Sequence, residues 1–436
     1  MVEKVVVVGL GYVGLPTAAL IADKRYEVLG VDVNEALVSE LQAGRCPLGE
    51  AEIIPVVERA LSSGRLRAAI KPDNGDIFII CVPTPITPNK RADLSMVTKA
   101  VQAAMQHVRP GNMVILESTS PIGTTESIIA GAARDVGLDP TIDLDICYCP
   151  ERVFPGNTIN EILKNDRVVG GLTPRAALRA KGFYESFCAG KAFPVTAAEA
   201  EFSKLMENTY RDVNIALANS FAHIAERSGI DVSKVIEVAN RHPRVNVHTP
   251  GPGVGGHCIP VDPWFLVERY PEETKLIHEA RLINDRQPER LLAAAGASGL
   301  VAGEKVAILG AAYRGNIDDA RDTPTEKLID ALADAGLTWA THDPHVTRMH
   351  IESGRDPNLT ADLIDAVRGA AAVFVMTDHT QYKHLAPASF SGLLPRMIVD
   401  GRRLVDTDAF LAAGVTVISV GAPTVSAGDY VQRIPA

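Results

Sequence analysis

Short apolar runs alternate with amphipathic, helix-like stretches over the first 195 residues of the chain. Such an alternation is typical of a parallel sheet whose strands are connected by helices, and we predict helices on both faces of that sheet. The strands that we predict in this part are Val5–Val8, Glu27–Val31, Ile77–Cys81, Met113–Glu117 and Leu144–Cys149.

The same alternation returns after residue 301. Lys305–Gly310 resembles the opening strand, and Thr338–His342 leads to Asp343 as Glu27–Val31 leads to Asp32. We therefore predict a second fold of the same topology. Val373–Met376 and Met397–Val399 continue its sheet, Asp400-Gly-Arg402-Arg403 ends its last strand, and residues 422–436 form a tail.

A long helix is predicted between these two parts. Thr196-Ala-Ala-Glu199 is a capping box, the helical pattern runs to Ser228, and Gly229 stops it. At 1.5 Å per residue the helix is about 45 Å long, which suits a connector between lobes or the seam of a dimer. Its apolar positions are Phe202, Leu205, Met206, Val213, Leu217, Phe221 and Ile224.

A glycine triplet follows the first strand directly. Gly9, Gly11 and Gly14 open the first helix, and Asp32 ends the next strand eighteen residues after Gly14. In one strand–helix–strand unit this pattern predicts a dinucleotide site, with the pyrophosphate at the helix N-terminus and the carboxylate on the ribose. Since a carboxylate repels a 2′-phosphate, we expect NAD rather than NADP; the alternative is a tight turn without ligand. Tyr12 and Val13, inside the triplet, belong to the same candidate cofactor site.

The predicted fold class is therefore α/β, with two Rossmann-like doubly wound domains joined by a long central helix and a helical middle region. We place the NAD-binding domain at residues 1–195, the central catalytic and dimerisation region at 196–300, and the second Rossmann-like domain at 301–436.

Charge and composition narrow the possible partners. The net charge of −10 argues against nucleic acid or an anionic membrane surface as a partner. No apolar run is long enough to span a bilayer, and Val5–Val8 is too short for a signal peptide. The six cysteines show no paired metal spacing. We expect a cytoplasmic protein with reduced thiols and no metal site.

Three further strand ends carry polar loops, where open α/β sheets place their ligands. Thr84 follows one strand and Thr119 the next, so both are candidates to line the cofactor, although each could instead cap a helix. Glu151, Arg152 and Val153 leave the following strand and bring an acid and a base together.

The stretch from Pro250 to Trp264 combines glycines and prolines around one thiol, Cys258, with Asp262 four residues later. A stiff loop almost bare of side chains suits a covalent nucleophile, whereas the alternative is a small buried thiol. On the long helix, Lys204, Asn208 and Arg211 recur at helical spacing and project from one side. That stripe could serve this loop, or it could be a solvated face.

Assembled, these motifs resemble the nucleotide-sugar 6-dehydrogenases, which include the UDP-glucose and UDP-N-acetylhexosamine dehydrogenases. The resemblance covers essentially the whole chain. The runs Glu207–Asn214, His242–Asn246 and Gly255–Trp264 look most like the UDP-N-acetyl-D-mannosamine dehydrogenase branch.

The resemblance implies an NAD-dependent, four-electron oxidation of the sugar C6 alcohol to a uronic acid, for polysaccharide biosynthesis, by a homodimer. Cys258 would carry a thiohemiacetal and then a thioester, two NADH would form, Lys204 and Asn208 would stabilise the C6 oxygen, and Asp262 and Glu151 would handle water and protons. The residues implied around the UDP-sugar are Arg152, Val153, Lys204, Asn208, Arg211, His242, Arg244, Gly255, Tyr313, Arg314 and Arg402, and Arg321 would reach the cofactor.

Two departures and three alternatives stay open. Arg314 replaces an expected Lys, and Arg403 rivals Arg402. The substrate could be UDP-glucose or UDP-N-acetylglucosamine. A hydroxyacid dehydrogenase that transfers one hydride, or a nucleotide-sugar binder without activity, would also share parts of the pattern, but neither needs Cys258.

Overall fold

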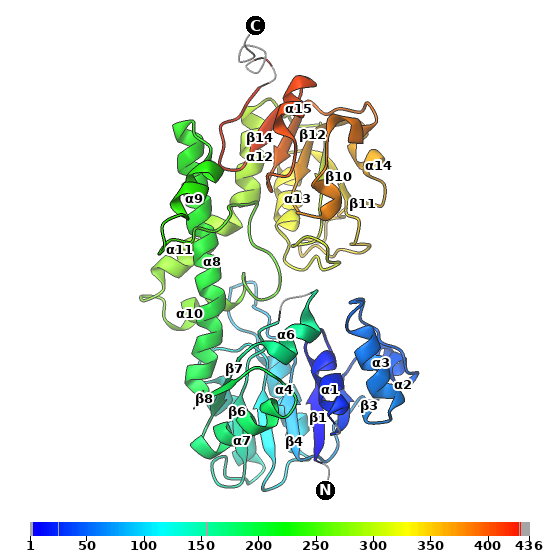
Figure 1. Ribbon diagram of the computed structural model, residues 1–436, viewed down its shortest axis with the longest axis vertical. Coiled ribbons are helices and arrows are strands. Elements are labelled where there is room, and N and C mark those ends of the chain that lie inside the picture. The colour runs from blue at the N-terminus through cyan, green and yellow to red at the C-terminus, as the bar shows by residue number, and fades with distance from the viewer. Residues whose placement is uncertain (1–2, 25, 154–155, 427, 429–436) are drawn as a thin grey trace. The chain divides into compact units, whose positions relative to one another are not determined.

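The computed structural model describes residues 3–24, 26–153, 156–426 and 428 (Figure 1). Contacts divide the chain into a first unit, Met1–Glu207 with Trp264–Arg269, and a second unit, Asn208–Pro263 with Tyr270–Ala436. Helix α8, Ala197–Ser228, contributes to both. The functional division at residues 195 and 300 stays a prediction, and residues 427 and 429–436 of the expected tail lie outside the described residues.

The first unit contains an eight-stranded sheet in the order β3-β2-β1-β4-β5-β6-β7-β8. All neighbouring strands run parallel except β6 and β7, which are antiparallel. The strand order reverses between β1 and β4, and a dinucleotide is expected at that point of such a sheet. The strands are β1 Lys4–Val8, β2 Glu27–Val31, β3 Leu66–Ala69, β4 Ile77–Ile80, β5 Met113–Leu116, β6 Asp145–Tyr148, β7 Arg167–Gly171 and β8 Ala192–Thr196.

Helices cover both faces of this sheet. Val5 and Val7 of β1 point into one apolar cluster, with α1, α3, α6 and α7, whereas Val6 and Val8 point into the other, with α4, η1, α5 and the start of α8. Burial on both faces explains why the strands are apolar without alternation. The helices are α1 Gly14–Asp23, α2 Glu35–Gln42, α3 Ile54–Ser62, α4 Ser95–Met105, η1 Thr125–Ile129, α5 Ala130–Asp135, α6 Thr158–Lys164 and α7 Pro174–Glu185.

The second unit repeats the design with a six-stranded, all-parallel sheet in the order β11-β10-β9-β12-β13-β14. Two apolar clusters again lie on opposite faces of its central strands. Its strands are β9 Lys305–Leu309, β10 Thr338–His342, β11 Leu359–Thr360, β12 Ala370–Val375, β13 Met397–Asp400 and β14 Thr416–Ser419. Its helices are α9 Val232–Ala239, α11 Lys275–Asp285, α12 Gln287–Ala297, α13 Pro324–Asp334, α14 Leu363–Val367, η2 Thr380–Tyr382, η3 Pro387–Phe390 and α15 Thr407–Ala412; α10, Asp262–Arg269, has residues in both units.

The predicted fold class is confirmed, with two corrections. The first sheet is not wholly parallel, because β7 returns antiparallel to β6. The strand that ends at Asp400 is not the last one, since β14 pairs with it and forms the edge of the second sheet. Neither feature follows from the local sequence pattern: β14 is a four-residue strand at the edge of its sheet, and the direction of β7 is set by its pairing with β6. Among the described residues, no helix is long and apolar enough to cross a membrane.

Helix α8 begins and ends as predicted. Thr196 and Glu199 form the capping box: the Thr196 N–H donates to Glu199 Oε2 at 2.8 Å, and the Glu199 N–H donates to Thr196 Oγ1 at 3.3 Å. Gly229, with φ of +71°, follows the last turn in the left-handed conformation that helix C-termini favour. The helix is drawn as one continuous green coil in Figure 1.

The two faces of α8 are opposite in character to those of an ordinary surface helix. Its polar residues Glu201, Lys204, Asp212 and Asn219 are buried, at helical spacing. Its apolar side chains on another face are exposed: Phe202, Met206, Tyr210, Leu217, Phe221 and Ile224 are each 40–63% accessible. The inward stripe of Glu201, Lys204, Asp212 and Asn219 is therefore not a solvated face, whereas Arg211 of the predicted stripe is exposed, as is the apolar stripe.

Candidate active site

The three glycines after β1 do three different things. Gly9 has φ of +97°, and a Cβ there would lie 2.5 Å from the Cys81 carbonyl oxygen. A Cβ at Gly14 would overlap the Gly9 carbonyl, so this glycine lets α1 pack close to the turn. At Gly11, by contrast, a Cβ would meet nothing within 4 Å. No side chain caps the start of α1. The turn therefore fits a pyrophosphate, which would approach the bare backbone at Gly11.

Asp32 lies at the carboxyl end of β2 and faces this turn. Its carboxylate accepts hydrogen bonds from the Leu10 N–H at 2.8 Å and from the Asn34 N–H at 2.9 Å. Each carboxylate oxygen keeps a further lone pair, so the group is oriented while it can still accept from a ribose hydroxyl. In the loops after β4 and β5, the Thr84 hydroxyl donates to the Thr119 carbonyl at 2.6 Å. The structure thus brings these two threonines together, and neither caps a helix.

We predict a preference for NAD over NADP of at least about 100-fold in kcat/KM, because the Asp32 carboxylate would repel a 2′-phosphate. The substitution Asp32→Asn keeps an acceptor for the Leu10 N–H and removes the charge, so it should reduce the preference to less than tenfold. Steady-state kinetics with both cofactors check this, and comparable kcat/KM values for the unsubstituted protein would contradict the assigned role.

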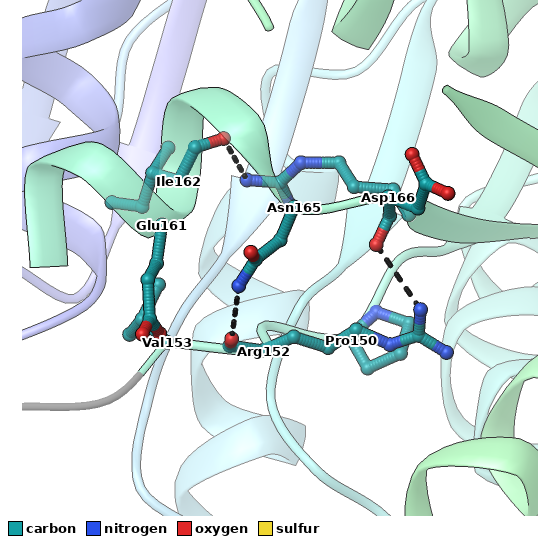
Figure 2. A pocket seen from close by; sticks show the side chains of 8 residues that line it. Pro150, Arg152, Val153, Glu161, Ile162, Asn165 and Asp166 are labelled. Carbon is teal, nitrogen blue, oxygen red and sulfur yellow. Dashed lines mark hydrogen bonds between the residues drawn. The ribbon is translucent and has the colours of Figure 1, made fainter. Parts of the chain in front are cut away.

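The loop after β6 holds Glu151, Arg152 and Val153. Glu151 accepts a short hydrogen bond from the Val153 N–H. Figure 2 shows the Arg152 side chain turned towards Asp166, whose carbonyl it contacts at 3.1 Å, and Arg152 is also ion-paired with Glu207 of α8. With its guanidinium engaged in this way, Arg152 fixes the loop. Any contact with a substrate would come from the remaining donors or from the backbone.

Glu201, which the sequence analysis did not single out, fixes the loop that carries Thr119. It is fully buried on α8 and accepts from the N–H groups of Gly123 and Thr125 and from the Thr125 hydroxyl. Burial raises the pKa of Glu201, although these hydrogen bonds oppose the rise. Three residues further along the helix, Lys204 is also buried, on the same inward face.

In the second unit, the segment around Cys258, residues 251–262, forms a loop that we call the Cys258 loop. A tyrosine leaves no room for a side chain at two of its glycines. A Cβ at Gly255 would lie 2.8 Å from Tyr313 Cβ, and one at Gly256 would lie 3.0–3.3 Å from the Tyr313 ring. The Gly256 N–H donates to the Arg321 carbonyl at 3.1 Å. The loop therefore lies flat against the segment after β9. Burial raises the pKa of the Tyr313 hydroxyl, and so do the nearby Asp319 and Cys258, so this hydroxyl stays a neutral donor.

Cys258 is half-buried and reduced, and it sits in the turn that opens α10. Its carbonyl accepts from the N–H groups of Val261 and Asp262, at 3.0 and 2.8 Å. Asp262 is buried and accepts from the amide of Asn208 at 2.5 Å. The structure thus joins the predicted catalytic residues Asn208 and Asp262 directly, one turn of chain from the thiol.

The glycine triplet is missing after β9, and a buried carboxylate accepts hydrogen bonds from backbone N–H groups of this loop. Asp343 ends β10, as Asp32 ends β2, but its Oδ2 accepts from the Ala311 and Ala312 N–H groups at 2.7 and 2.9 Å. His379 Nε2 lies 2.9 Å from the same oxygen, and His379 Nδ1 accepts from the Asn316 N–H at 2.9 Å. Asp343 is therefore occupied by its own chain, and it clamps the loop that presents Tyr313 and Arg314.

The Asp343 clamp predicts a pH dependence of stability. Burial alone would raise the pKa of Asp343, but the hydrogen bonds from His379 and the backbone outweigh burial and lower this pKa to about 2. A depressed pKa contributes stability above the unfolded value near 4, and this stability, about 2 kcal/mol, is lost as the pH falls towards 2. Denaturant titrations should show that the destabilisation caused by Asp343→Asn is smaller at pH 3 than at pH 6 by roughly 1 kcal/mol, because about half of this stability is lost by pH 3. An equal effect at both pH values would contradict the clamp.

The structure separates the two rival arginines. Arg403 is ion-paired with Asp231 at 2.9 Å and donates to the Val420 carbonyl, so it has a structural role. Arg402 donates to the Met376 carbonyl at 2.9 Å, and its Nη1 lies 3.5 Å from where a Gly251 Cβ would be. Arg402 is thus the arginine beside the Cys258 loop. Arg321 is paired with Asp319 at 2.6 Å, and its predicted contact with the cofactor stays a prediction.

Three predicted substrate residues lie at the surface. Arg211, His242 and Arg244 are exposed. His242 Nδ1 accepts from the Arg244 N–H at 3.4 Å, which holds the turn after α9. Their contact with a sugar stays a prediction.

The two folds define a class of protein. Three features are the parts of a two-domain, NAD-dependent dehydrogenase. One unit has an intact glycine turn, and the other has a thiol loop packed on an altered dinucleotide-type fold. Helix α8, which contributes to both units, carries buried polar residues. Comparison identifies which one: the chain belongs to the UDP-glucose/GDP-mannose dehydrogenase family. The family's NAD-binding domain matches residues 3–188, its central domain 198–286, and its UDP-binding domain 307–407.

Relatives match over almost their whole length. A UDP-N-acetyl-D-mannosamine dehydrogenase of Methanocaldococcus jannaschii is 39% identical over 429 residues, 96% of each chain. An NDP-N-acetyl-D-galactosaminuronic acid dehydrogenase of Ralstonia nicotianae is 39% identical over 405 residues, 91% of this chain and 95% of the relative. A solved structure of UDP-D-ManNAc dehydrogenase from Pyrococcus horikoshii superimposes with a TM-score of 0.88 at 36% identity, covering 98% of this chain and all of that one.

Proposed function

We propose that this protein oxidises the C6 alcohol of UDP-N-acetyl-D-mannosamine to the carboxylate, producing two NADH through a thioester on Cys258. The observation that carries the proposal is the packing of the Cys258 loop, through Gly255 and Gly256, on Tyr313 of the fold that matches the family's UDP-binding domain. A UDP bound by this fold would place its sugar in the unit that also carries Cys258. The names of the relatives from Methanocaldococcus jannaschii and Pyrococcus horikoshii support the choice of sugar.

The overall reaction balances as one alcohol, one water and two NAD⁺ giving one carboxylate, two NADH and three protons. NAD supplies the hydride acceptor for both oxidations, and the residues that would hold it are Gly9, Gly11, Gly14, Asp32 and the pair Thr84 and Thr119.

The thiol of Cys258 carries the covalent step. Its thiolate adds to the C6 aldehyde, the new C–S bond forms, and the carbonyl electron pair moves to oxygen. After the second oxidation the carbon is a thioester; water then adds, the C–S bond breaks, and the thiolate is restored. A thiolate is a far better leaving group than an alkoxide, so one residue can serve both capture and release.

Charge on the C6 oxygen is assigned to Lys204 and Asn208, which lie four residues apart on α8 and so share a face. The hydrogen bond of Asn208 to Asp262 orients its amide. Asp262 and Glu151 are the carboxylates assigned to proton transfer and to the attacking water. These roles rest on the family motifs, and the structure contributes the burial of Lys204 and Asp262.

The test of this proposal is to count products with UDP-N-acetyl-D-mannosamine as substrate. Two NADH per uronic acid support it, whereas one NADH per turnover, with a carbonyl product, would return the protein to single-hydride chemistry. The Ralstonia nicotianae relative favours one further candidate, an N-acetylgalactosamine-type substrate, so UDP-N-acetylgalactosamine belongs in the same panel.

We also propose that the protein is a homodimer formed along α8, because its exposed apolar side chains recur at helical spacing. Light scattering at micromolar concentration should give twice the mass of one chain. Tyr210→Glu, which places a charge in the middle of the stripe, should shift the mass towards one chain, and a monomeric unsubstituted protein would contradict the assignment.

A further inference from the structure

Two amide side chains of α8 hold the Cys258 loop, one at each end. At the start of the loop, the Gly251 N–H donates to Asn219 Oδ1 at 2.9 Å. At its end, Asn208 Nδ2 donates to Asp262 Oδ2 at 2.5 Å. Asn208 and Asn219 are eleven residues apart, which is about three helical turns, so they lie on one face. The family motifs include Asn208, but Asn219 has no role in the function proposed above.

The direction of the hydrogen bonds at Asn219 is fixed by its neighbours. The Gly251 N–H can only donate, so the Asn219 oxygen must face the loop and its NH₂ must face away. That NH₂ donates to Asn284 Oδ1 at 2.9 Å, and Asn284 Nδ2 in turn donates to the Asp212 carbonyl and carboxylate at 3.0 and 2.9 Å. Asn219, Asn284 and Asp212 are all at most 1% exposed. Each hydrogen bond in this chain has a fixed donor and a fixed acceptor. The Asn219 amide therefore cannot flip without breaking its hydrogen bonds to Gly251 and Asn284.

A buried arginine secures the far end of this chain of hydrogen bonds. Arg281 of α11 is ion-paired with Asp212 and, at 2.5 Å, with Asp285, and its side chain is fully buried. Lys327 of α13 is paired with Asp285 as well. The backbone of α11 also lies against the loop, because a Cβ at Gly253 would be 3.1 Å from the Asn284 carbonyl. The side chains that hold the start of the loop are therefore themselves fixed by buried hydrogen bonds and ion pairs.

We propose that Asn219 is a positioning residue for Cys258: it holds the start of the Cys258 loop, at Gly251, so that the thiol meets the aldehyde carbon. The middle of this loop packs on Tyr313 through Gly255 and Gly256, and the hydrogen bonds of Asn219 and Asn208 fix its two ends. Misplacement of a nucleophile by about 1 Å can cost 100-fold in rate. The inference rests on the proposed thioester chemistry, in which the aldehyde must be captured before it leaves.

The experiment compares Asn219→Ala, Asn219→Asp and Ser220→Ala. Alanine removes both hydrogen bonds. A protonated aspartic acid has nearly the same shape as asparagine, and it can accept from Gly251 and donate to Asn284, so it should restore function partly. Ser220, the next residue, donates only to the carbonyl of Ala216 within its own helix and is the matched control.

Three quantities test the inference in each variant: kcat with UDP-N-acetyl-D-mannosamine, the fraction of turnovers that release an aldehyde trapped by a hydrazide, and the rate of Cys258 alkylation by iodoacetamide. The KM for NAD is measured as a control. For Asn219→Ala we expect kcat to fall at least 30-fold, trapped aldehyde to rise at least fivefold as a fraction of turnovers, and alkylation of the half-buried thiol to accelerate at least fivefold. The KM for NAD should stay within twofold. Asn219→Asp should fall between these values, and Ser220→Ala should match the unsubstituted protein.

A loss of activity in Asn219→Ala with an unchanged aldehyde fraction and an unchanged alkylation rate would overturn the inference. If Asn219 only stabilised the fold, the variant would contain fewer folded molecules, and each folded molecule would react as the unsubstituted protein does. If the alanine variant does not fold, the aspartate variant is judged by the same three readouts. Failure of the unsubstituted protein to oxidise the sugar would instead reject the proposed function, and the alkylation rates, which need no substrate, would still test the restraint.

Discussion

Replacement of Cys258 by serine is expected to lower kcat for UDP-sugar oxidation at least 1,000-fold and to leave the dissociation constant for NAD unchanged. Serine keeps the shape and the hydrogen bonding of the loop, but its hydroxyl is a much weaker nucleophile than a thiolate at neutral pH and a much poorer leaving group. The glycine cradle for NAD lies in the first unit, away in the sequence from the substitution, so cofactor binding should not respond.

The matched control is Cys46→Ser, since Cys46 is also a half-buried, reduced thiol. It should keep kcat within twofold. Stopped-flow absorbance at 340 nm measures NADH formation, and intact mass spectrometry detects the sugar adduct on the unsubstituted protein. Full activity of Cys258→Ser would end the covalent mechanism while leaving the family assignment untouched.

The parts of the fold that could be predicted from the sequence are those in which local pattern and burial agree. Glu27–Val31 and Thr338–His342 have the same bounds in the structure as in the prediction, because each is a central strand between clear turn signals. The capping box at Thr196 and the stop at Gly229 are likewise local. The edge strand β14 has only four residues, and the antiparallel return of β7 depends on tertiary pairing that the sequence does not display.

The buried polar groups of the site were the least predictable. Asp212 and Asn219 of α8 are buried, whereas most of the apolar positions predicted for this helix are exposed. Their seven-residue spacing from each other, in line with Asn208, was the available signal. Asp343 shows the converse problem: its position matches Asp32 and both accept backbone hydrogen bonds, but one oxygen of Asp343 accepts two backbone N–H groups and also contacts His379. The position of Asp343 in the sequence suggests a ligand-binding carboxylate, and only its contacts show that it binds its own chain.

The choice of substrate carries the other large expected effect. If the run from His242 to Asn246 reads the acetamido group or the diphosphate, kcat/KM for UDP-N-acetyl-D-mannosamine should exceed that for UDP-glucose at least about 1,000-fold. The groups of this run are exposed in the structure, and a bound sugar would cover them; a sugar with a plain hydroxyl would then bury them without partners and be rejected strongly.

Arg244 is the residue of this run that we expect to bind the substrate. Its guanidinium is permanently charged and forked, which suits a diphosphate, and its side chain is exposed. His242 is the weaker candidate, because its Nδ1 already accepts from the Arg244 N–H and so holds the turn. Arg244→Ala should raise the KM for the UDP-sugar more than tenfold with little change in the KM for NAD. Arg241→Ala is the control: Arg241 is three residues earlier, is also exposed, and is paired at the surface with Glu237 at 3.5 Å. Initial rates over a matrix of both substrates separate the two KM values. Equal kcat/KM for UDP-glucose and UDP-N-acetyl-D-mannosamine would withdraw the assignment of the sugar and leave the protein within the wider family.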